Sequence, residues 1–564
     1  MNNAATLRKS AGSGVSSLVL AVNNTGTVQA LAGYLSLDGG GSSSGVFQAG
    51  PACTNAFGGF THTLLAGTRF EGDGLFTVWQ NYTATTLSFA APILITNRFE
   101  LNNGGVIGGT NVGIFAGPFT WIGGQLGEAG RTVFTNSATV TITTGNTKRL
   151  RTRTVDNHTT VTYSGTALLA DNFGVWNNQS GSVFDVQNDY GIAFGGLGGY
   201  ATFNNFGTFK KSAGTALADT QLNMRNATAG SIVRSQTGIL GFSVSYIQTN
   251  GLTELAGGNF SGALFDIRGG TLSGAGNIAA NVLNNGTVLP GGSVGRLAIS
   301  NNVAQTFTAL TNSLLTFEIG GLTPGTGHDQ IRANNGTATL AGTLRAVLAN
   351  GYIPTAGNTY TVMTFTARSG VLTNFSFPDY QFGVVHTATE VILIASNAIP
   401  AVQLDLPATQ LVCTPFLLQT AASDLDGGVT NLSVFLGADL LASFPNGSLR
   451  ELTVEYDFPG AATFKARATD NLGAVRETNF TAFFTTLPLH VLQLGGPRTN
   501  GVFKLCMFGE AGSNYTMLAM TNVSSPLSNW TSLGRMKNTN GIWRYLDNGT
   551  LTNRAYRFYR AQQQ

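Results

Sequence analysis

The most charged stretch of the chain runs from Lys148 to His158 and carries three arginines at alternate positions. Side chains two residues apart lie on the same face of a β-strand, so the alternation predicts that Arg149, Arg151 and Arg153 share one outward face. Guanidinium groups pair bidentately with carboxylate and sulfate, so this face would suit an acidic polysaccharide. The more ordinary interpretation, which we favour from the sequence, is a solvated strand face that deters edge-to-edge pairing.

A second group of interest is acidic and lies much later in the chain. Asp424 and Asp426 stand two residues apart before a Gly-Gly pair, and Asp470 follows in a separate turn-like segment. Carboxylate oxygens are the ligands that calcium prefers, so a fold that collects these aspartates would suit that ion. The spacing is not that of an EF-hand loop, and Asp is also common in tight turns that bind nothing. The turn interpretation is the more ordinary one, so we expect no cofactor; calcium is the ion that these residues could hold.

Two strings fit the G-x-S-x-G pattern of a serine nucleophile elbow, residues 41–45 and 291–295. An elbow needs a strand before it, a helix after it and a His partner, whereas both strings lie in Gly-rich segments with no helical pattern following. Polysaccharide-cleaving β-helices use clustered aspartates, but those before residue 320 form no Asp-Asp or Asp-x-Asp motif. We therefore expect no catalytic site. The scattered aspartates are Asp156, Asp171, Asp185, Asp189, Asp219 and Asp266.

The chain has only three cysteines, Cys53, Cys413 and Cys506. They lie far apart, which fits neither a dense disulfide framework nor a metal-ligand pair with short spacing. We expect each of them to be a small buried hydrophobic residue.

The elements that position these residues are predicted to be almost all β. Only 10% of the 564 residues are charged while 74 are Gly, and short alternating runs such as residues 139–143 recur between Gly and Asn clusters. No apolar run reaches the 18 residues that a membrane-spanning helix needs. The net charge of +3 comes without a basic domain, which disfavours nucleic acid as a partner.

An Asn-containing turn followed by a small residue and a β-branched residue returns along the first 320 residues. The spacing is often roughly 20 to 27 residues, the range of solenoid repeats. One such repeat cannot bury its apolar face alone, but stacked coils bury one another's faces and pair their backbones. The pattern predicts a parallel β-helix of roughly 14 coils. Members of the repeat are residues 23–28, 177–183, 204–209 and 284–288.

Residues 1–12 match residues 203–214 almost position for position. The chain therefore opens inside a repeat, and we expect an export signal and further coils to lie upstream of Met1.

Three motifs follow one another in residues 269–295: GTLSGxG, NxGTV and PGxSxG. Together they resemble the passenger-associated transport repeat of autotransporter-like proteins. The resemblance implies a right-handed β-helix over residues 1–320 that is exported to the cell surface, with terminal coils and a cap over residues 321–396. The chain ends in Gln rather than in the aromatic residue that closes an autotransporter barrel, so the resemblance does not imply a secretion route.

Two smaller β modules are expected after the solenoid. Residues 422–429 and 468–474 resemble bacterial Ig-like domains, which implies a β-sandwich over residues 399–486. Residues 488–564 resemble C-terminal modules of large secreted bacterial proteins. Trp530 and Trp543 of that module could stack on sugars, but large aromatics in so small a module usually form its core.

The sequence thus predicts a non-catalytic, secreted or cell-surface repeat protein, a structural or adhesive rod that displays binding modules. Cell-envelope or extracellular polysaccharide is the expected partner. One alternative is a β-helix lyase or hydrolase, which an acidic cluster on the rod would favour. The other is a carbohydrate-binding protein, which a long aromatic or basic groove would favour.

Overall fold

The computed structural model describes the whole chain except residues 144, 301–302, 489–490, 495–502 and 548–556. The chain forms two compact units: Met1–Pro378 with Phe382–Ala395, and Asp379–Gln381 with Ser396–Gln564. The prediction of a nearly all-β chain with a β-helix followed by β-sandwich modules is confirmed. The one helical element among the described residues is a single 3₁₀ turn, η1 (Leu527–Asn529).

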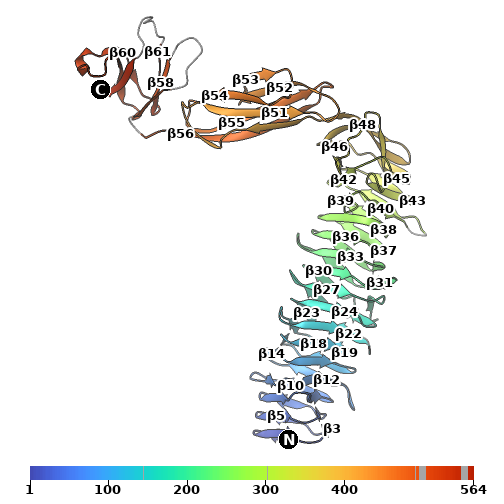
Figure 1. Cartoon of the computed structure of the whole chain (residues 1–564). Coiled ribbons are helices and arrows are strands. Elements are labelled where there is room, and N and C mark those ends of the chain that lie inside the picture. Colours follow the sequence, from blue (N-terminus) through green and yellow to red (C-terminus); the bar gives the residue numbers. More distant parts are fainter. Residues whose placement is uncertain (144, 301–302, 489–490, 495–502, 548–556) are drawn as a thin grey trace. The chain divides into compact units, whose positions relative to one another are not determined.

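The first unit is a parallel β-solenoid of about 15 turns (Figure 1). Each turn contributes strands to three faces, and each strand pairs in parallel with its counterpart in the next turn, so the stack is roughly 70 Å long. The first face has ten strands: β1 (Asn2–Asn3), β4 (Asn23–Asn24), β7 (Gly41–Ser43), β10 (Phe60–Leu64), β13 (Thr85–Phe89), β16 (Gly105–Gly108), β19 (Gly124–Leu126), β22 (Lys148–Arg151), β25 (Leu168–Asp171) and β28 (Ile192–Phe194).

The other two faces follow the same order of turns. In the central coils the second face comprises β14 (Ile93–Ile95), β17 (Val112–Phe115), β20 (Arg131–Phe134), β23 (Thr154–Asn157), β26 (Val175–Asn178), β29 (Thr202–Asn205), β32 (Asn223–Asn226) and β35 (Ser245–Gln248). The third comprises β15 (Arg98–Leu101), β18 (Pro118–Trp121), β21 (Thr139–Ile142), β24 (Thr160–Tyr163), β27 (Val183–Val186), β30 (Thr208–Lys211), β33 (Ile232–Ser235) and β36 (Leu252–Ala256).

The interior of the solenoid is filled by side chains that repeat from coil to coil. Phe99 and Phe119 occupy the same register position, and their rings stack 6.0 Å apart. Trp176 and Phe203 do the same 6.3 Å apart. Such rings bury a large apolar area each, so the repeat gives the stack a continuous core.

One corner of the solenoid is held by a ladder of buried amides. The side chain of Asn157 donates to Asn178 over 2.8 Å, Asn178 to Asn205 over 2.9 Å, and Asn205 to Asn226 over 2.9 Å. Asn226 continues the ladder to Gln248 over 3.1 Å. A buried amide without partners would cost free energy, but here each coil supplies the partner for the next.

The last coils change from parallel to antiparallel pairing. β44 (Thr343–Leu348) still pairs in parallel with β46 (Asn374–Ser376), whereas β45 (Thr359–Gly370) pairs antiparallel with β48 (Glu390–Ala398). An antiparallel partner uses the hydrogen-bonding groups of β45 that a further coil would otherwise take, and so covers that edge.

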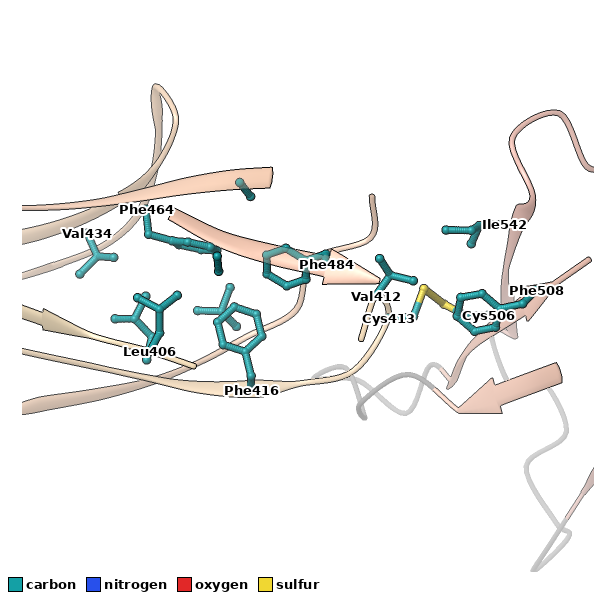
Figure 2. Packing of buried hydrophobic residues seen from close by; sticks show 14 residues of the cluster. Leu406, Val412, Cys413, Phe416, Val434, Phe464, Phe484, Cys506, Phe508 and Ile542 are labelled. Atoms are coloured by element: carbon teal, nitrogen blue, oxygen red, sulfur yellow. A yellow bond between two sulfur atoms is a disulfide. The ribbon is translucent and has the colours of Figure 1, made fainter. Parts of the chain in front are cut away.

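The second unit contains a sandwich of a three-stranded sheet, β49-β51-β54, and a five-stranded sheet, β50-β56-β55-β52-β53. Its core includes Leu418, Val434, Phe464 and Phe484, some of which Figure 2 shows. The strands are β49 (Ala401–Asp405), β50 (Thr409–Leu411), β51 (Phe416–Ser423), β52 (Val429–Leu436), β53 (Asp439–Phe444), β54 (Arg450–Val454), β55 (Gly460–Asp470) and β56 (Val475–Thr485).

Two three-stranded sheets follow, β57-β58-β61 and β60-β59-β62. Trp543 lies in their core beside Met507 and Tyr515, as expected, whereas Trp530 is only half buried. The strands are β57 (Val491–Leu494), β58 (Phe503–Phe508), β59 (Asn514–Met520), β60 (Thr531–Lys537), β61 (Ile542–Asp547) and β62 (Phe558–Gln563).

The prediction for the cysteines is wrong for two of the three. Cys413 and Cys506, 93 residues apart in sequence, form a disulfide (Figure 2). Cys53 is buried and free, as predicted. Spacing along the chain could not reveal the bond, because the fold brings the turn before β51 against β58.

Candidate functional site

Two of the three predicted arginines meet on the outside of the solenoid. Arg151 donates from Nε and Nη2 to the two carboxylate oxygens of Asp171 over 2.7 and 3.0 Å. Arg149 Nη1 lies 3.9 Å from the same carboxylate, with the side chain 36% exposed. Asp171 therefore neutralises one of the two cations and leaves a net positive charge on this face.

The expectation that Arg153 shares that face is wrong. The strand β22 ends at Arg151, and Thr152 has a left-handed backbone with φ 64°, which breaks the alternation on which the prediction rested. Arg153 is 0% exposed. Burial lowers the pKa of its guanidinium to about 10, and the charge of Glu128 opposes this shift.

Polar partners inside the solenoid satisfy the Arg153 guanidinium. Its Nε donates to Thr132 Oγ1 over 2.8 Å. Its other nitrogens donate to backbone carbonyls only, so this arginine supports the corner between coils rather than facing a ligand. The carbonyls belong to Gly109, Asn111, Gly127, Ala129 and Arg131.

Exposed aromatic rings at the corner after the arginine pair were not predicted from the sequence. Phe173 follows β25 at the corner beyond Asp171 and is 68% exposed. Tyr200, in the next coil, is 43% exposed, and its ring lies 4.6 Å from that of Phe194. The available signal was the run Gly195–Gly199, whose four glycines leave the neighbouring rings uncovered.

The structure brings the three predicted aspartates to one end of the sandwich. Asp426 Oδ2 accepts from the Tyr380 hydroxyl over 2.7 Å and from the Ala398 amide over 3.0 Å. Asp470 is buried, and its Oδ2 accepts from Asn397 Nδ2 over 2.9 Å. The amides after Asp470 bind its other oxygen, which is the ordinary chemistry of an Asp turn.

Asp424 is held less completely than its two neighbours. Burial raises the pKa of its carboxyl group, as do the charges of Asp426 and Asp470. The amides of Leu425 and Asp426 moderate the shift, but neither carboxylate oxygen accepts a well-aligned hydrogen bond from the described residues. Asn397 is 4% exposed, and its Oδ1 likewise lacks a donor there. The cluster thus combines excess negative charge with buried oxygens that need a positive partner.

These oxygen donors fit calcium in chemical type, since it takes carboxylate and amide oxygens. They are less compact than a closed site. Among the described residues, the set of His, Cys, Asp and Glu ligand atoms that lies within 4.8 Å consists of Cys413, Glu455, Asp457 and Cys506.

That compact set already has a cation. The buried Lys504 ammonium lies 2.8 Å from Glu455 and forms an ion pair with Asp457, while the two sulfurs are joined to each other. Arg544 Nε also lies 3.2 Å from Asp457, so two cations balance the two carboxylates without a metal ion.

The catalytic candidates remain dispersed on the solenoid. Residues 41–43 of the first G-x-S-x-G string form β7, and residues 291–295 form a turn, with no helix after either one in the described chain. Each scattered aspartate has its own polar partner. The shortest contacts are Asp156–Arg131 at 2.6 Å, Asp171–Arg151 at 2.7 Å, Asp185–Ser212 at 2.6 Å, Asp189–Lys211 at 2.7 Å, Asp219–Ser243 at 2.7 Å and Asp266–Arg268 at 2.8 Å.

The described residues include no helix with the length and apolarity needed to cross a membrane. No protein-family model matches the chain, and no curated protein matches it.

Several solved β-sandwich structures share a weak likeness with the chain. Fibronectin(III)-like modules of Clostridium thermocellum CbhA are 14% identical, cover 26% of this chain and 78% of their own, and give a TM-score of 0.14. Carbohydrate-binding modules of the β-sandwich superfamily with promiscuous specificity are 12% identical, cover 29% of this chain and 84% of their own, and give a TM-score of 0.15. The matched structure of a 1.5-MDa bacterial ice-binding adhesin is 10% identical, covers 28% of this chain and 56% of its own, and gives a TM-score of 0.14.

Proposed function

We propose that this chain is a non-catalytic, secreted or cell-surface protein in which a solenoid rod has a structural or adhesive role and displays binding modules. The observation that carries the proposal is that buried groups inside the rod bind one another from coil to coil. The amide ladder from Asn157 to Gln248 and the stacked rings bind the coils to one another and leave the outer faces free for partners.

The proposal of a passenger-type solenoid draws support from the three motifs of residues 269–295. GTLSGxG and NxGTV lie on β38 (Thr271–Asn284) and β39 (Thr287–Pro290), which pair in parallel. The turn after β39 folds back, because the Gly274 amide donates to the Gly291 carbonyl over 3.2 Å. The motifs therefore form one local structural unit, which is the form in which a transport repeat would be recognised.

The non-catalytic part of the proposal rests on how the rod holds its carboxylates. Hydrolysis or elimination on a polysaccharide needs an acid and a base that act on one sugar. The aspartates considered above are each engaged by a separate polar partner, so none is paired with another as such chemistry requires.

The test uses the full chain and a panel of cell-envelope and extracellular polysaccharides fixed to a matrix. We expect retention on at least one polymer without release of reducing ends or unsaturated products. Release above a heat-denatured control would contradict the non-catalytic role. Absence of retention on every polymer and on cell-envelope preparations would contradict the adhesive role.

A second proposal concerns Asp424, Asp426 and Asp470, which we propose bind calcium together with Asn397. The buried oxygens of Asp424 and Asn397 that lack a donor carry this proposal, because a cation would supply the charge and contacts that they need. Since Asn397 directly precedes the sandwich, the ion would stiffen the entry of the chain into this module.

Melting the full chain with calcium and with chelator tests this proposal. We expect calcium to raise the transition of the second unit by several degrees, because a ligand that binds only the folded state stabilises it. Asp424→Asn should abolish the response, whereas Asp405→Asn, an exposed change in β49 of the same module, should retain it. Equal transitions of the unmodified chain in calcium and chelator would refute the site.

A further inference from the structure

The corner that follows the first face of the solenoid has a backbone that most residues avoid. In two successive coils it contains Glu128 with φ 59° and Thr152 with φ 64°. In the next coil two adjacent residues are left-handed, Asn172 with φ 46° and Phe173 with φ 60°. Asn tolerates this conformation, but a bulky aromatic there is a genuine outlier.

The next coil holds the backbone at this position, and the Phe173 ring faces solvent. The Phe173 amide donates to the Gly199 carbonyl over 3.2 Å, and the Asn172 amide donates to the Leu197 carbonyl over 2.9 Å. A Cβ atom on Gly199 would lie 2.3 Å from Phe173 Cε1, so the ring packs directly against this glycine. The glycine loop therefore supports the ring from beneath.

Further apolar groups extend this surface along the next coil. Leu197 is 54% exposed, and Tyr200 adds a second exposed ring braced by Phe194. Single exposed apolar residues are common, but several on one corner, one of them in a strained conformation, point to a binding surface.

The arginine pair adds charge close to these rings. Asp171, the partner of Arg151, is two residues before Phe173 in the chain. In the next two coils, the residues at the register position of Arg149 are Leu169 and Ala193. Neither of them offers Arg149 a carboxylate. Arg149 pairs with Leu169, four residues before Phe173, so strand geometry places it at most roughly 14 Å from Phe173, a separation that a short oligosaccharide spans.

We propose that Phe173, Tyr200 and Arg149 form a binding site for an acidic glycan. The apolar C–H faces of the sugars would stack on the two rings, whose π-faces are negative and attract C–H groups. A carboxylate or sulfate of the glycan would pair with Arg149, the cation that Asp171 engages only loosely. This inference rests on the proposed adhesive role and names the ligand class and the site for it.

The test compares the affinity of full-chain variants for polygalacturonate at low salt. Phe173→Asn with Tyr200→Thr removes both rings, and Asn is well suited to the left-handed backbone. We expect at least about a tenfold loss of affinity, since stacking on two rings is worth more than 1.4 kcal/mol. The matched control is Phe60→Asn, because Phe60 also has a left-handed backbone with φ 57° and is 55% exposed, but lies on β10, four coils away from the strand that carries Arg149.

Arg149→Gln separates charge recognition from stacking. It should weaken binding to polygalacturonate and flatten its dependence on salt, but leave any binding to a neutral polymer unchanged. Retention of full affinity by the double ring variant, with the unmodified chain binding polygalacturonate, would refute this site and leave the adhesive role standing.

The remaining outcomes separate the two proposals. If the unmodified chain binds only neutral polymers, or binds polygalacturonate equally well after both ring and arginine changes, the acidic-glycan site is wrong. If it binds no polymer at all, the adhesive role fails as well. Self-association that the ring changes abolish would identify a second copy of the chain as the true occupant.

Discussion

The solenoid and the sandwich unit solve the same problem of buried polar groups in different ways. In the solenoid, Asn178 receives a bond from Asn157 below it and donates one to Asn205 above it. In the second unit, Lys504 is neutralised by a local pair of carboxylates that occurs once, beside a disulfide that also occurs once. Repetition gives these buried amides a partner of their own kind, whereas the second unit, which has no such repeat, holds its buried charge with individual ion pairs beside a covalent bond.

Each region also contains an exception to this pattern of buried and satisfied groups. Phe173 interrupts the solenoid with a strained, exposed ring, and Asp424 leaves the sandwich with carboxylate oxygens that lack a well-aligned donor among the described residues. Departures that cost stability without a local benefit are the natural places to look for ligands.

The largest expected effect tests the covalent part of the comparison. Replacing both bridged cysteines, Cys413→Ser with Cys506→Ser, opens a loop of 93 residues and should destabilise the second unit by roughly 4 kcal/mol. Hydrogen exchange in β51 and β58 should accelerate while exchange in the solenoid stays unchanged. Equal acceleration in the solenoid would show that the two regions are not stabilised separately.

The next effect concerns the one arginine inside the solenoid. Arg153→Met keeps much of the side-chain volume but leaves five carbonyl oxygens without this donor, so we expect a local loss of about 3 kcal/mol. Hydrogen exchange in the neighbouring strand β20 measures it. Arg149→Met is the exposed control and should change exchange little; equal effects would refute the buried role of Arg153.

Breaking the amide ladder should have a smaller effect. Asn178→Ala removes the shared partner of Asn157 and Asn205, and we expect a loss of about 2 kcal/mol. Asn204→Ala removes the less buried amide pair that Asn204 forms with Asn177. We expect its loss of stability to be only a few tenths of the loss for Asn178→Ala. Hydrogen exchange in β26 and β29 measures both losses. Similar losses in the two variants would show that the stability contributed by an amide pair does not depend on its burial.

The smallest effect tests the uncompensated carboxylates of the sandwich. The folded-state pKa of Asp424 is raised, so its contribution to stability is complete below the unfolded value near 3.9 and is lost as the pH rises through the folded value. In chelator, Asp424 should therefore contribute a rise in the melting temperature of the second unit as the pH is lowered from 7 toward about 3.9. Asp424→Asn should flatten this slope, and an unchanged slope would assign it to another group.

The architecture could be predicted from the sequence because it depends on patterns that recur. Alternating apolar residues and Asn turns at solenoid spacing indicate stacked coils. The β modules were predicted because their turn segments resemble those of known β domains. The Cys413–Cys506 bond could not be predicted, since it depends on where two distant segments meet.

The details of the candidate sites depended on single backbone angles. The alternation of Arg149 and Arg151 held along β22, but the left-handed Thr152 turned Arg153 inward. The same kind of corner turned Phe173 outward, and nothing in the alternation of apolar residues marks a residue that is apolar and exposed. Sequence periodicity specifies strands well, but the corners between them are set by local torsions and by the neighbouring coil.

Size-exclusion chromatography of full-length polygalacturonate, after prolonged incubation with the full chain at low salt, tests the central claim most directly. It reports both whether the chain binds the polymer and whether it cuts it. We expect the chain to co-elute with polymer of unchanged length. Shortened polymer would contradict the non-catalytic role, and a chain that elutes alone beside intact polymer would contradict the acidic-glycan site on the rod.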